Sequence, residues 1–496
     1  ARPTAGFGYL YTAARLLQQG FAVSRFYDNA WFGARVGEYA PGVFDLYSPN
    51  PPTVSLILLP LAGLDYASAR GIWMLFNLIC LSGIVGVLGA VGGHRRGVWV
   101  LAFIALALAY QPLYAVFRDA QVYGLLLGLL VAAWYGYRRR RDGWLGAALG
   151  LLLVFKLAGL WLWPLLVVER RWRALAWGAA TALAVCVVSL PWLGIEAWLA
   201  GFRALAELGG QPSNAVTAYQ TLMSLTRHLT TYDAQWNPSP WLDWPALGAW
   251  LFGLGFLMIT GLSLYQAHRS GASNLAFAAL VAAGVILSPS SLDYHYLLML
   301  LPIALLIAEW QRRVTRFNFR LVIDDFRLTI INHTSKINAR HTPAVVQRAA
   351  STGSGRTEFI PVVRGVLRAL AGTPVRGEFN ARRLAPALLL IAIALIAADL
   401  PYRSPRLAEG AWALLAYPKL AGAMLIWGLA VWPTGRSALM QFGRPTGRCA
   451  TRSAYAPEPP SAGGHSPLRG CAQLVRKTHE RATRQRPSPY RRRRRL

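Results

Sequence analysis

The chain of 496 residues contains only four cysteines, and their placement gives no indication of cysteine chemistry. Cys80 and Cys186 fall inside apolar runs, whereas Cys449 and Cys471 lie in a polar C-terminal region. None has the spacing typical of a metal site or a redox pair. A glycine-rich phosphate loop is also missing. We therefore predict no cofactor and assign no residue to a metal, and whether a divalent cation takes part stays open.

Acidic side chains are scarce as well, since 21 Asp and Glu accompany 51 Lys and Arg to give a net charge of +30. An excess of this size is typical of nucleic-acid-binding proteins. Its distribution favours another role, because much of it lies in short clusters between apolar runs and in a tail that ends in arginines at 491–495. We expect anionic membrane lipids as partners of the basic clusters, and no nucleic acid.

Apolar runs dominate the rest of the chain. It is 55% hydrophobic with 19 Trp, and its mean hydropathy is +0.35. Many runs approach the roughly 20 residues that a helix needs to cross a bilayer. A soluble protein of this length would instead have amphipathic helices. The sequence predicts an all-α fold, a polytopic transmembrane helical bundle.

Basic clusters fix the predicted orientation of this bundle. Lys and Arg are retained on the cytoplasmic side of a membrane. The loops between the clusters are rich in Asp, His, Gln, Asn, Trp and Pro, and are therefore expected on the extracytoplasmic face. The clusters end apolar runs at 94–96, 138–141, 170–173, 268–269 and 312–313.

Five regions follow from this pattern. The chain starts at Ala1 with neither a signal peptide nor a span before the first loop, so we expect a first span to be missing. The regions are an extracytoplasmic loop at 1–52, a transmembrane core at 53–310 with an outer loop at 194–244, a basic cytoplasmic insert at 311–384, two spans at 385–432 and a disordered Arg-rich tail at 433–496.

The run 144–168 has a basic cluster at each end, so both ends are expected in the cytoplasm. A broken hairpin with its apex near Lys156 satisfies the charge rule, and one continuous span is the alternative. Charged groups at membrane depth are expensive and suggest function. Lys156 is therefore predicted to bind a phosphate or carboxylate, with snorkelling to the interface as the alternative.

A second candidate site is the outer turn 288–295, which places Asp293 and His295 two residues apart. A carboxylate and an imidazole can accept from and donate to a polar ligand. Ordinary helix capping by Ser290 or Ser291 is the alternative reading of the turn.

Polar residues of two other loops complete the predicted binding set. Arg118 and Gln121 belong to the turn 118–121, where an ion pair between Arg118 and Asp119 is the alternative. Gln220 and His228 belong to a polar stretch of the long loop that could bind sugar hydroxyls.

The N-terminal loop supplies outer-facing carboxylates at Asp28, Glu38 and Asp45. One of them could act as a general base that deprotonates a hydroxyl nucleophile. Asp28 is our candidate catalytic residue.

Several short motifs follow one another along the chain. They are Tyr-Ser-Pro-Asn-Pro-Pro at 47–52 with Leu-Pro-Leu-Ala at 59–62, Ala-Gln-Val-Tyr at 120–123, Phe-Lys-Leu at 155–157, Arg-Arg-Trp-Arg-Ala at 170–174 and the turn 288–295. In their order and spacing they resemble motifs of the GT-C class of integral-membrane glycosyltransferases. The resemblance is closest to glycosyltransferase family 87, the bacterial polyprenyl-phosphate-mannose-dependent, α-mannosyltransferase-like enzymes, and covers about residues 6–310.

The resemblance implies a multi-pass enzyme of the bacterial inner (plasma) membrane. It would transfer a hexose, mannose above others, from a polyprenyl-phosphate donor to an envelope lipid or glycan acceptor at the extracytoplasmic face. Lys156 and His295 would hold the donor phosphate during a base-assisted direct displacement.

One position departs from the family pattern, in which an Asp-Phe pair often opens the first outer loop and supplies the base. Alignment places Gly6-Phe7 there. Three explanations stay open: a truncated N-terminus, substitution by Asp28, or an inactive chain. The competing functions are a transporter or flippase of a lipid-linked sugar and an inactive membrane scaffold. We rank the transferase first, because the sequence has no internal repeat of the transporter type.

Overall fold

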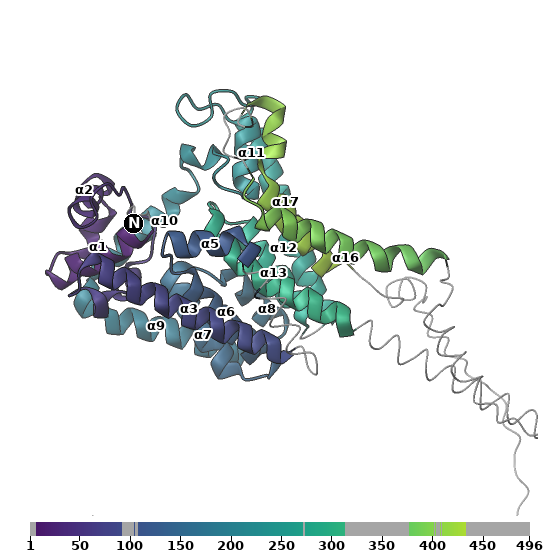
Figure 1. The fold of residues 1–496 in the computed structure, drawn as a ribbon, viewed down its shortest axis with the longest axis horizontal. Helices are drawn as coiled ribbons and strands as arrows, with labels where there is room; N and C mark the ends of the chain where they lie inside the picture. Colours follow the sequence, from purple (N-terminus) through teal and green to yellow (C-terminus); the bar gives the residue numbers. More distant parts are fainter. Residues whose placement is uncertain are drawn as a thin grey trace, which may run out of the picture. The chain divides into compact units, whose positions relative to one another are not determined.

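The computed structural model describes residues 6–91, 108–270, 273–312, 376–400 and 409–432, together with positions 104, 402 and 407. Every regular element in these segments is an α-helix or a 3-10 helix (Figure 1). The predicted all-α polytopic fold is confirmed. The described elements all belong to one compact unit, which spans residues 1–433. Most of the predicted insert and the whole predicted tail lie outside the described residues.

Long apolar helices form the membrane-crossing part of this unit. Among the described residues, 4 helices are long and apolar enough to cross a bilayer, or 5 if a pair bent by 57° counts as one span. They are α3 (Tyr66–Val91), α9 (Trp172–Leu193), α12 (Pro245–Ser270), the helix at 293–312 that begins with η7 (Asp293–Met299), and the bent pair of η9 (Gly410–Ala416) and α17 (Pro418–Val431).

The arginine-flanked run 144–168 folds as α7 (Asp142–Lys156), η5 (Leu160–Leu162) and α8 (Trp163–Val168). Asp142, at the start of α7, accepts a hydrogen bond 2.9 Å long from Nε of Arg171, which follows α8. The two basic ends of the run therefore meet, as the broken-hairpin interpretation predicts, and Lys156 lies at the far end of α7.

Close packing of α7 on α9 confirms that the chain turns back between them (Figure 1). A Cβ atom on Gly146 would lie 2.3 Å from the Ala174 carbonyl oxygen, and one on Gly150 would lie 2.6 Å from the Gly178 carbonyl oxygen. Small residues permit this backbone approach, which is typical of membrane helices. The contacts advance in the same direction along both helices. Parallel neighbours require a return segment, which η5 and α8 supply.

The N-terminal region is more structured than a loop. It contains α1 (Phe7–Gln18), η1 (Val23–Tyr27) and α2 (Asn29–Tyr39). Helix α1 is buried on nearly every face. The apolar stretch 52–61 forms the 3-10 turns η2 (Pro52–Leu56) and η3 (Leu59–Leu61). Each has a proline in its first turn, where the missing backbone N–H would have no helical partner.

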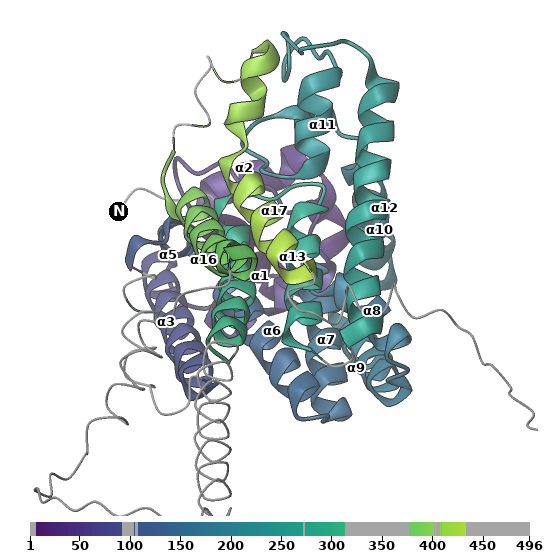
Figure 2. The same ribbon diagram turned by 90° about the vertical axis from the view of Figure 1, so that its right-hand side faces the viewer.

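Helices also occupy much of the predicted loop 194–244. They are α10 (Ile195–Leu208), η6 (Pro212–Ala215) and α11 (Leu222–Thr230). The other elements of the core are α5 (Gln111–Arg118), α6 (Tyr123–Arg138) and α13 (Asn274–Ile286). Near the C-terminus, α16 (Arg376–Ala397) packs on α17, and α17 packs on α13 (Figure 2).

Candidate active site

Lys156 is the last residue of α7, at the end opposite the arginines at 138–141. Leu157 ends the helix in the left-handed conformation, with φ 54°. A cation is favoured there because the carbonyl groups at a helix C-terminus carry partial negative charge. The ammonium group donates a hydrogen bond to Oδ1 of Asn50 and lies 5.5 Å from the centre of the Tyr9 ring. The Lys156 side chain is partly exposed, so a ligand can reach it.

Asn50 is held in place by its own loop. Its Nδ2 atom donates to the Tyr47 carbonyl oxygen over 2.6 Å, which directs Oδ1 toward Lys156. Thr53 donates from Oγ1 to the carbonyl oxygen of Val154 in the last turn of α7. This bond satisfies a helix-end carbonyl group and joins the loop to the helix that carries Lys156.

Asp45 places a carboxylate in the same region. Its Oδ2 atom accepts hydrogen bonds from the backbone N–H of Gly6 and, over 3.0 Å, from that of Tyr9. The carboxylate thus caps α1 from a distance, where the helix dipole favours an anion. Burial raises the pKa of Asp45 to about 6, although these N–H bonds and the Lys156 charge act in the opposite direction.

His295 enters the region from η7. Its Nδ1 atom accepts a hydrogen bond 3.0 Å long from the backbone N–H of Leu292. In a neutral ring this leaves Nε2 as the donor. The ring contacts those of Tyr123 and Tyr294, whose centres lie 4.6 and 4.8 Å away. The Lys156 ammonium group is close enough to act electrostatically on the His295 ring.

Two buried polar atoms border the cluster without a hydrogen-bond partner among the described residues. They are Oε1 of Gln121 and the hydroxyl oxygen of Tyr9. Both side chains are at most 4% exposed. An unsatisfied buried polar atom costs about 1–3 kcal/mol. A polar ligand that donates to these atoms would remove that cost.

These residues form one site, which we call the Lys156 cluster. Its ionisable members, Asp45, Lys156 and His295, are partly exposed. The side chains that support them are buried. The supporting side chains are Tyr9, Asn50, Gln121 and Tyr123. The arrangement presents an anion, a cation and an N–H donor from a rigid frame.

The structure places Asp28 and Arg118 in local interactions. Asp28 is exposed and caps α2, accepting from the backbone N–H of Ala30 and Trp31 over 3.1 Å each. Arg118 forms an ion pair with Asp119 in which Nε and Oδ1 are 2.9 Å apart, and 45% of its side chain is exposed. These contacts correspond to ordinary capping and to the predicted alternative of an ion pair.

Asp293, Gln220 and His228 contact the C-terminal helices. Asp293 accepts hydrogen bonds from Gln111 and Tyr402, and its Oδ1 atom lies 3.9 Å from Nζ of Lys419. Gln220 donates to the carbonyl oxygens of Thr217 and Ala416. His228 is 3.1 Å from the hydroxyl of Tyr417 through Nδ1. Of the predicted site residues, Lys156, His295 and Gln121 therefore belong to the Lys156 cluster, and Asp293, Gln220 and His228 form a second group.

Sequence reasoning did not select Tyr9, Tyr123 or Lys419. Tyrosine is common in membrane proteins at the interface, so the first two gave no distinct signal. Lys419 is fully buried in the apolar helix α17. The rule that singled out Lys156, a charge inside an apolar run, could have found Lys419 as well.

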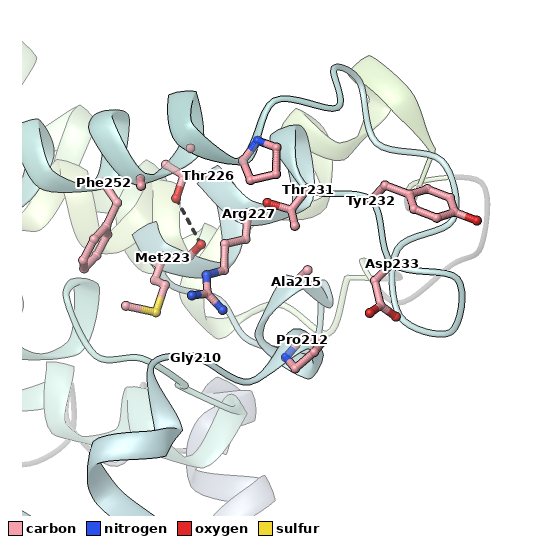
Figure 3. A pocket seen from close by; sticks show the side chains of 13 residues that line it. Gly210, Pro212, Ala215, Met223, Thr226, Arg227, Thr231, Tyr232, Asp233 and Phe252 are labelled. Carbon is pink, nitrogen blue, oxygen red and sulfur yellow. Dashed lines mark hydrogen bonds between the residues drawn. The ribbon is translucent and has the colours of Figure 1, made fainter.

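A separate hollow of about 380 Å³ lies between α11, α12 and the segment 210–215 (Figure 3). The Arg227 side chain extends into it from α11, and its Nη1 atom donates to the Gln211 carbonyl oxygen over 3.0 Å. The lining also includes Thr231, Tyr232 and Asp233. None of the lining residues belongs to the Lys156 cluster.

In a comparison with protein families, residues 49–290 match the sequence model of glycosyltransferase family 87. No curated protein and no solved structure matches the chain. The matched segment contains Asn50, Gln121 and Lys156, whereas Asp45 precedes it and His295 follows it.

Proposed function

We propose that this chain is a GT-C type enzyme that uses a polyprenyl-phosphate hexose. Its residues 49–290 belong to glycosyltransferase family 87, so the chain is a multi-pass membrane glycosyltransferase. The donor sugar is mannose. The acceptor is a lipid or glycan of the bacterial cell envelope, and transfer takes place at the extracytoplasmic face of the plasma membrane.

The convergence of Lys156 and His295 supports a phosphate-linked donor. The phosphate gains negative charge as its bond to the sugar breaks. A fixed cation and a preoriented N–H donor stabilise that charge most when water is largely excluded. The Lys156 ammonium group supplies the cation, and Nε2 of His295 supplies the donor. Asn50 orients the Lys156 ammonium group, and the Tyr123 and Tyr294 rings pack against His295.

Sugar transfer at this site is a single displacement. The acceptor hydroxyl oxygen forms a bond to the anomeric carbon while the bond from that carbon to the phosphate oxygen breaks. Polyprenyl phosphate leaves with the electron pair, and the hydroxyl proton passes to a carboxylate. One displacement inverts the configuration at the anomeric carbon.

Purified full-length protein with radiolabelled polyprenyl-phosphate mannose and an envelope lipid extract tests this function. We expect a new labelled lipid or glycan in the wild type. Lys156→Met removes the cation at similar length, and His295→Asn removes the Nε2 donor while Asn Oδ1 still accepts from Leu292. Each variant is expected to lose about 10²–10³-fold in rate, the range for one stabilising donor.

Arg35→Met is the matched control for the loss of a cation. Arg35 lies on the surface of α2 and pairs with Glu38 over 2.8 Å in an exposed ion pair, which contributes little to stability. Its transfer rate is expected to equal that of the wild type. Movement of the labelled donor across proteoliposomes without a new glycosidic product would instead support a flippase.

A further inference from the structure

Among the described carboxylates, Asp45 has a distinctive position. Its side chain is partly exposed and accepts from the backbone N–H of Tyr9, whose ring centre lies 5.5 Å from the Lys156 ammonium group. The Lys156 charge also acts on this carboxylate. Asp28 and Glu38, the other carboxylates of the N-terminal region, form exposed local contacts with Ala30, Trp31 and Arg35. A base for sugar transfer must stand near the group that holds the leaving phosphate. Of the three, Asp45 alone shows an interaction with Lys156.

The hydrogen bonds of Asp45 leave room for a substrate. Oδ2 accepts from Gly6 and Tyr9, and among the described residues Oδ1 accepts only from the N–H of the adjacent Leu46, at 3.1 Å. An ionised carboxylate has about four acceptor positions. A position therefore stays open to an acceptor hydroxyl, and the backbone bonds fix the direction of the carboxylate.

The charge environment keeps this carboxylate basic enough to take a proton. Burial disfavours its ionised form, and the groups that face it are Lys156 from α7, Tyr9 from α1, Tyr66 from α3 and Tyr294 from η7. Lys156 supplies the only formal charge in this set. Catalytic bases work best when their pKa is near the operating pH.

We propose that Asp45 is the general base that deprotonates the acceptor hydroxyl. The assignment rests on the proposed sugar transfer. In the step, an oxygen of Asp45 takes the hydroxyl proton as the acceptor oxygen attacks the anomeric carbon, and the phosphate leaves toward Lys156. The Gln121 Oε1 atom and the Tyr9 hydroxyl have no hydrogen-bond partner within the described part of the chain and suit a ligand rich in hydroxyl groups.

The test compares Asp45→Asn with the wild type in the transfer assay. Asparagine retains an oxygen that accepts from Gly6 and Tyr9, so the cap on α1 persists while the base is lost. We expect the turnover rate to fall by about 10²–10⁴-fold, the usual contribution of general base catalysis. Binding of polyprenyl-phosphate mannose is expected to stay within about threefold, because Lys156 and His295 are unchanged.

Asp65→Asn is the matched control. Asp65 is an exposed capping carboxylate that accepts from the N–H groups of Ala67 and Ser68 over 3.0 Å each. The same substitution there removes a charge from a helix cap outside the cluster, and full activity is expected.

The pH dependence separates a base from a structural cap. In the wild type, kcat/KM should fall about tenfold per pH unit below pH 6, where Asp45 becomes protonated. The residual activity of Asp45→Asn should lack this decline. A folded Asp45→Asn variant with the wild-type rate would overturn the assignment, and a large loss in Asp28→Asn would transfer the role to Asp28. A wild type that binds donor but forms no product would overturn the proposed function itself, and the base with it.

Discussion

Lys156 at the C-terminal end of α7 donates a hydrogen bond to Asn50, which lies in a loop far from it in sequence. The bond fixes the ammonium group at the edge of a site where a carboxylate and an imidazole also reach the surface. The amide is neutral, so it orients the cation without cancelling its charge. A phosphate can then still be attracted to Lys156.

Replacement of Asn50 by Asp should weaken donor binding. The new carboxylate would neutralise Lys156 at hydrogen-bond distance and repel the phosphate. We expect KM for the donor to rise about 10–100-fold, which corresponds to about 1.4–2.7 kcal/mol. Donor titrations of both proteins measure this, and an unchanged KM would show that the phosphate binds elsewhere.

Gly6 should not tolerate a side chain. Its φ is +116°, and a Cβ atom would lie 2.2 Å from Nε2 of Gln121. Gly20 has φ +82° but open space around it, so Gly20→Ala isolates the backbone cost. We expect Gly6→Ala to destabilise by about 1–3 kcal/mol more than Gly20→Ala, because it adds overpacking. Equal thermal unfolding of the two variants would contradict this packing. An acid restored at position 6 should likewise impair the protein.

Gly146 tests the close packing of α7 on α9. Gly146→Ala would place a methyl group 2.3 Å from the Ala174 carbonyl oxygen and is expected to cost about 1–3 kcal/mol. Gly128→Ala in α6 meets open space and should be neutral or slightly stabilising, since alanine favours helix. Thermal unfolding in detergent compares them, and a harmless Gly146→Ala would argue against the parallel contact.

Lys419 is expected to hold the C-terminal helices to the core. Its ammonium group lies 3.9 Å from Oδ1 of Asp293 and donates to Gln111 over 2.9 Å. Lys419→Met removes the cation from a buried pair, a change that costs about 3–5 kcal/mol. Because Asp293 is two residues from His295, activity should fall together with the melting temperature. If the variant kept its activity and its melting temperature, the Lys419–Asp293 pair would not be what holds α17 to the core.

Asp45 should also give the fold a measurable pH dependence. Its pKa is raised to about 6 in the folded protein, so the folded state holds the proton more tightly than the unfolded chain. The resulting stabilisation is present below about pH 4 and is lost as the pH rises to 6. Asp45→Asn does not titrate. Its melting temperature relative to that of the wild type should therefore increase between pH 4 and 6.5, and a constant difference would contradict the raised pKa.

The sequence was sufficient to predict the helical class and the hairpin that carries Lys156. The apolar runs indicate the lengths of the helices. The arginines at 138–141 and 170–173 indicate that both ends of the hairpin lie on the same side of the membrane. These features are local along the chain. The Asp142–Arg171 pair shows the same arrangement in three dimensions.

Which residues form the site depends on contacts between positions that are far apart in the sequence, and these could not be predicted from the sequence. Lys156, His295 and Gln121 came together because their turns share one end of the bundle. Asp45 was one of three plausible carboxylates, and only folding brought it to the start of α1 and to Lys156. Conversely, the polarity of Gln220 suggested a binding role, yet its amide bonds to backbone groups in a buried contact with η9.

Sugar transfer from a phosphate-linked lipid at the Lys156 cluster is tested by the initial rate of radiolabelled mannose transfer. The wild type and Lys156→Met are compared at equal amounts of folded protein. We expect a labelled glycosidic product whose rate of formation falls at least about 100-fold in the variant. Equal rates in the two proteins would contradict the site, and no product from the wild type with any polyprenyl-phosphate hexose would contradict the function.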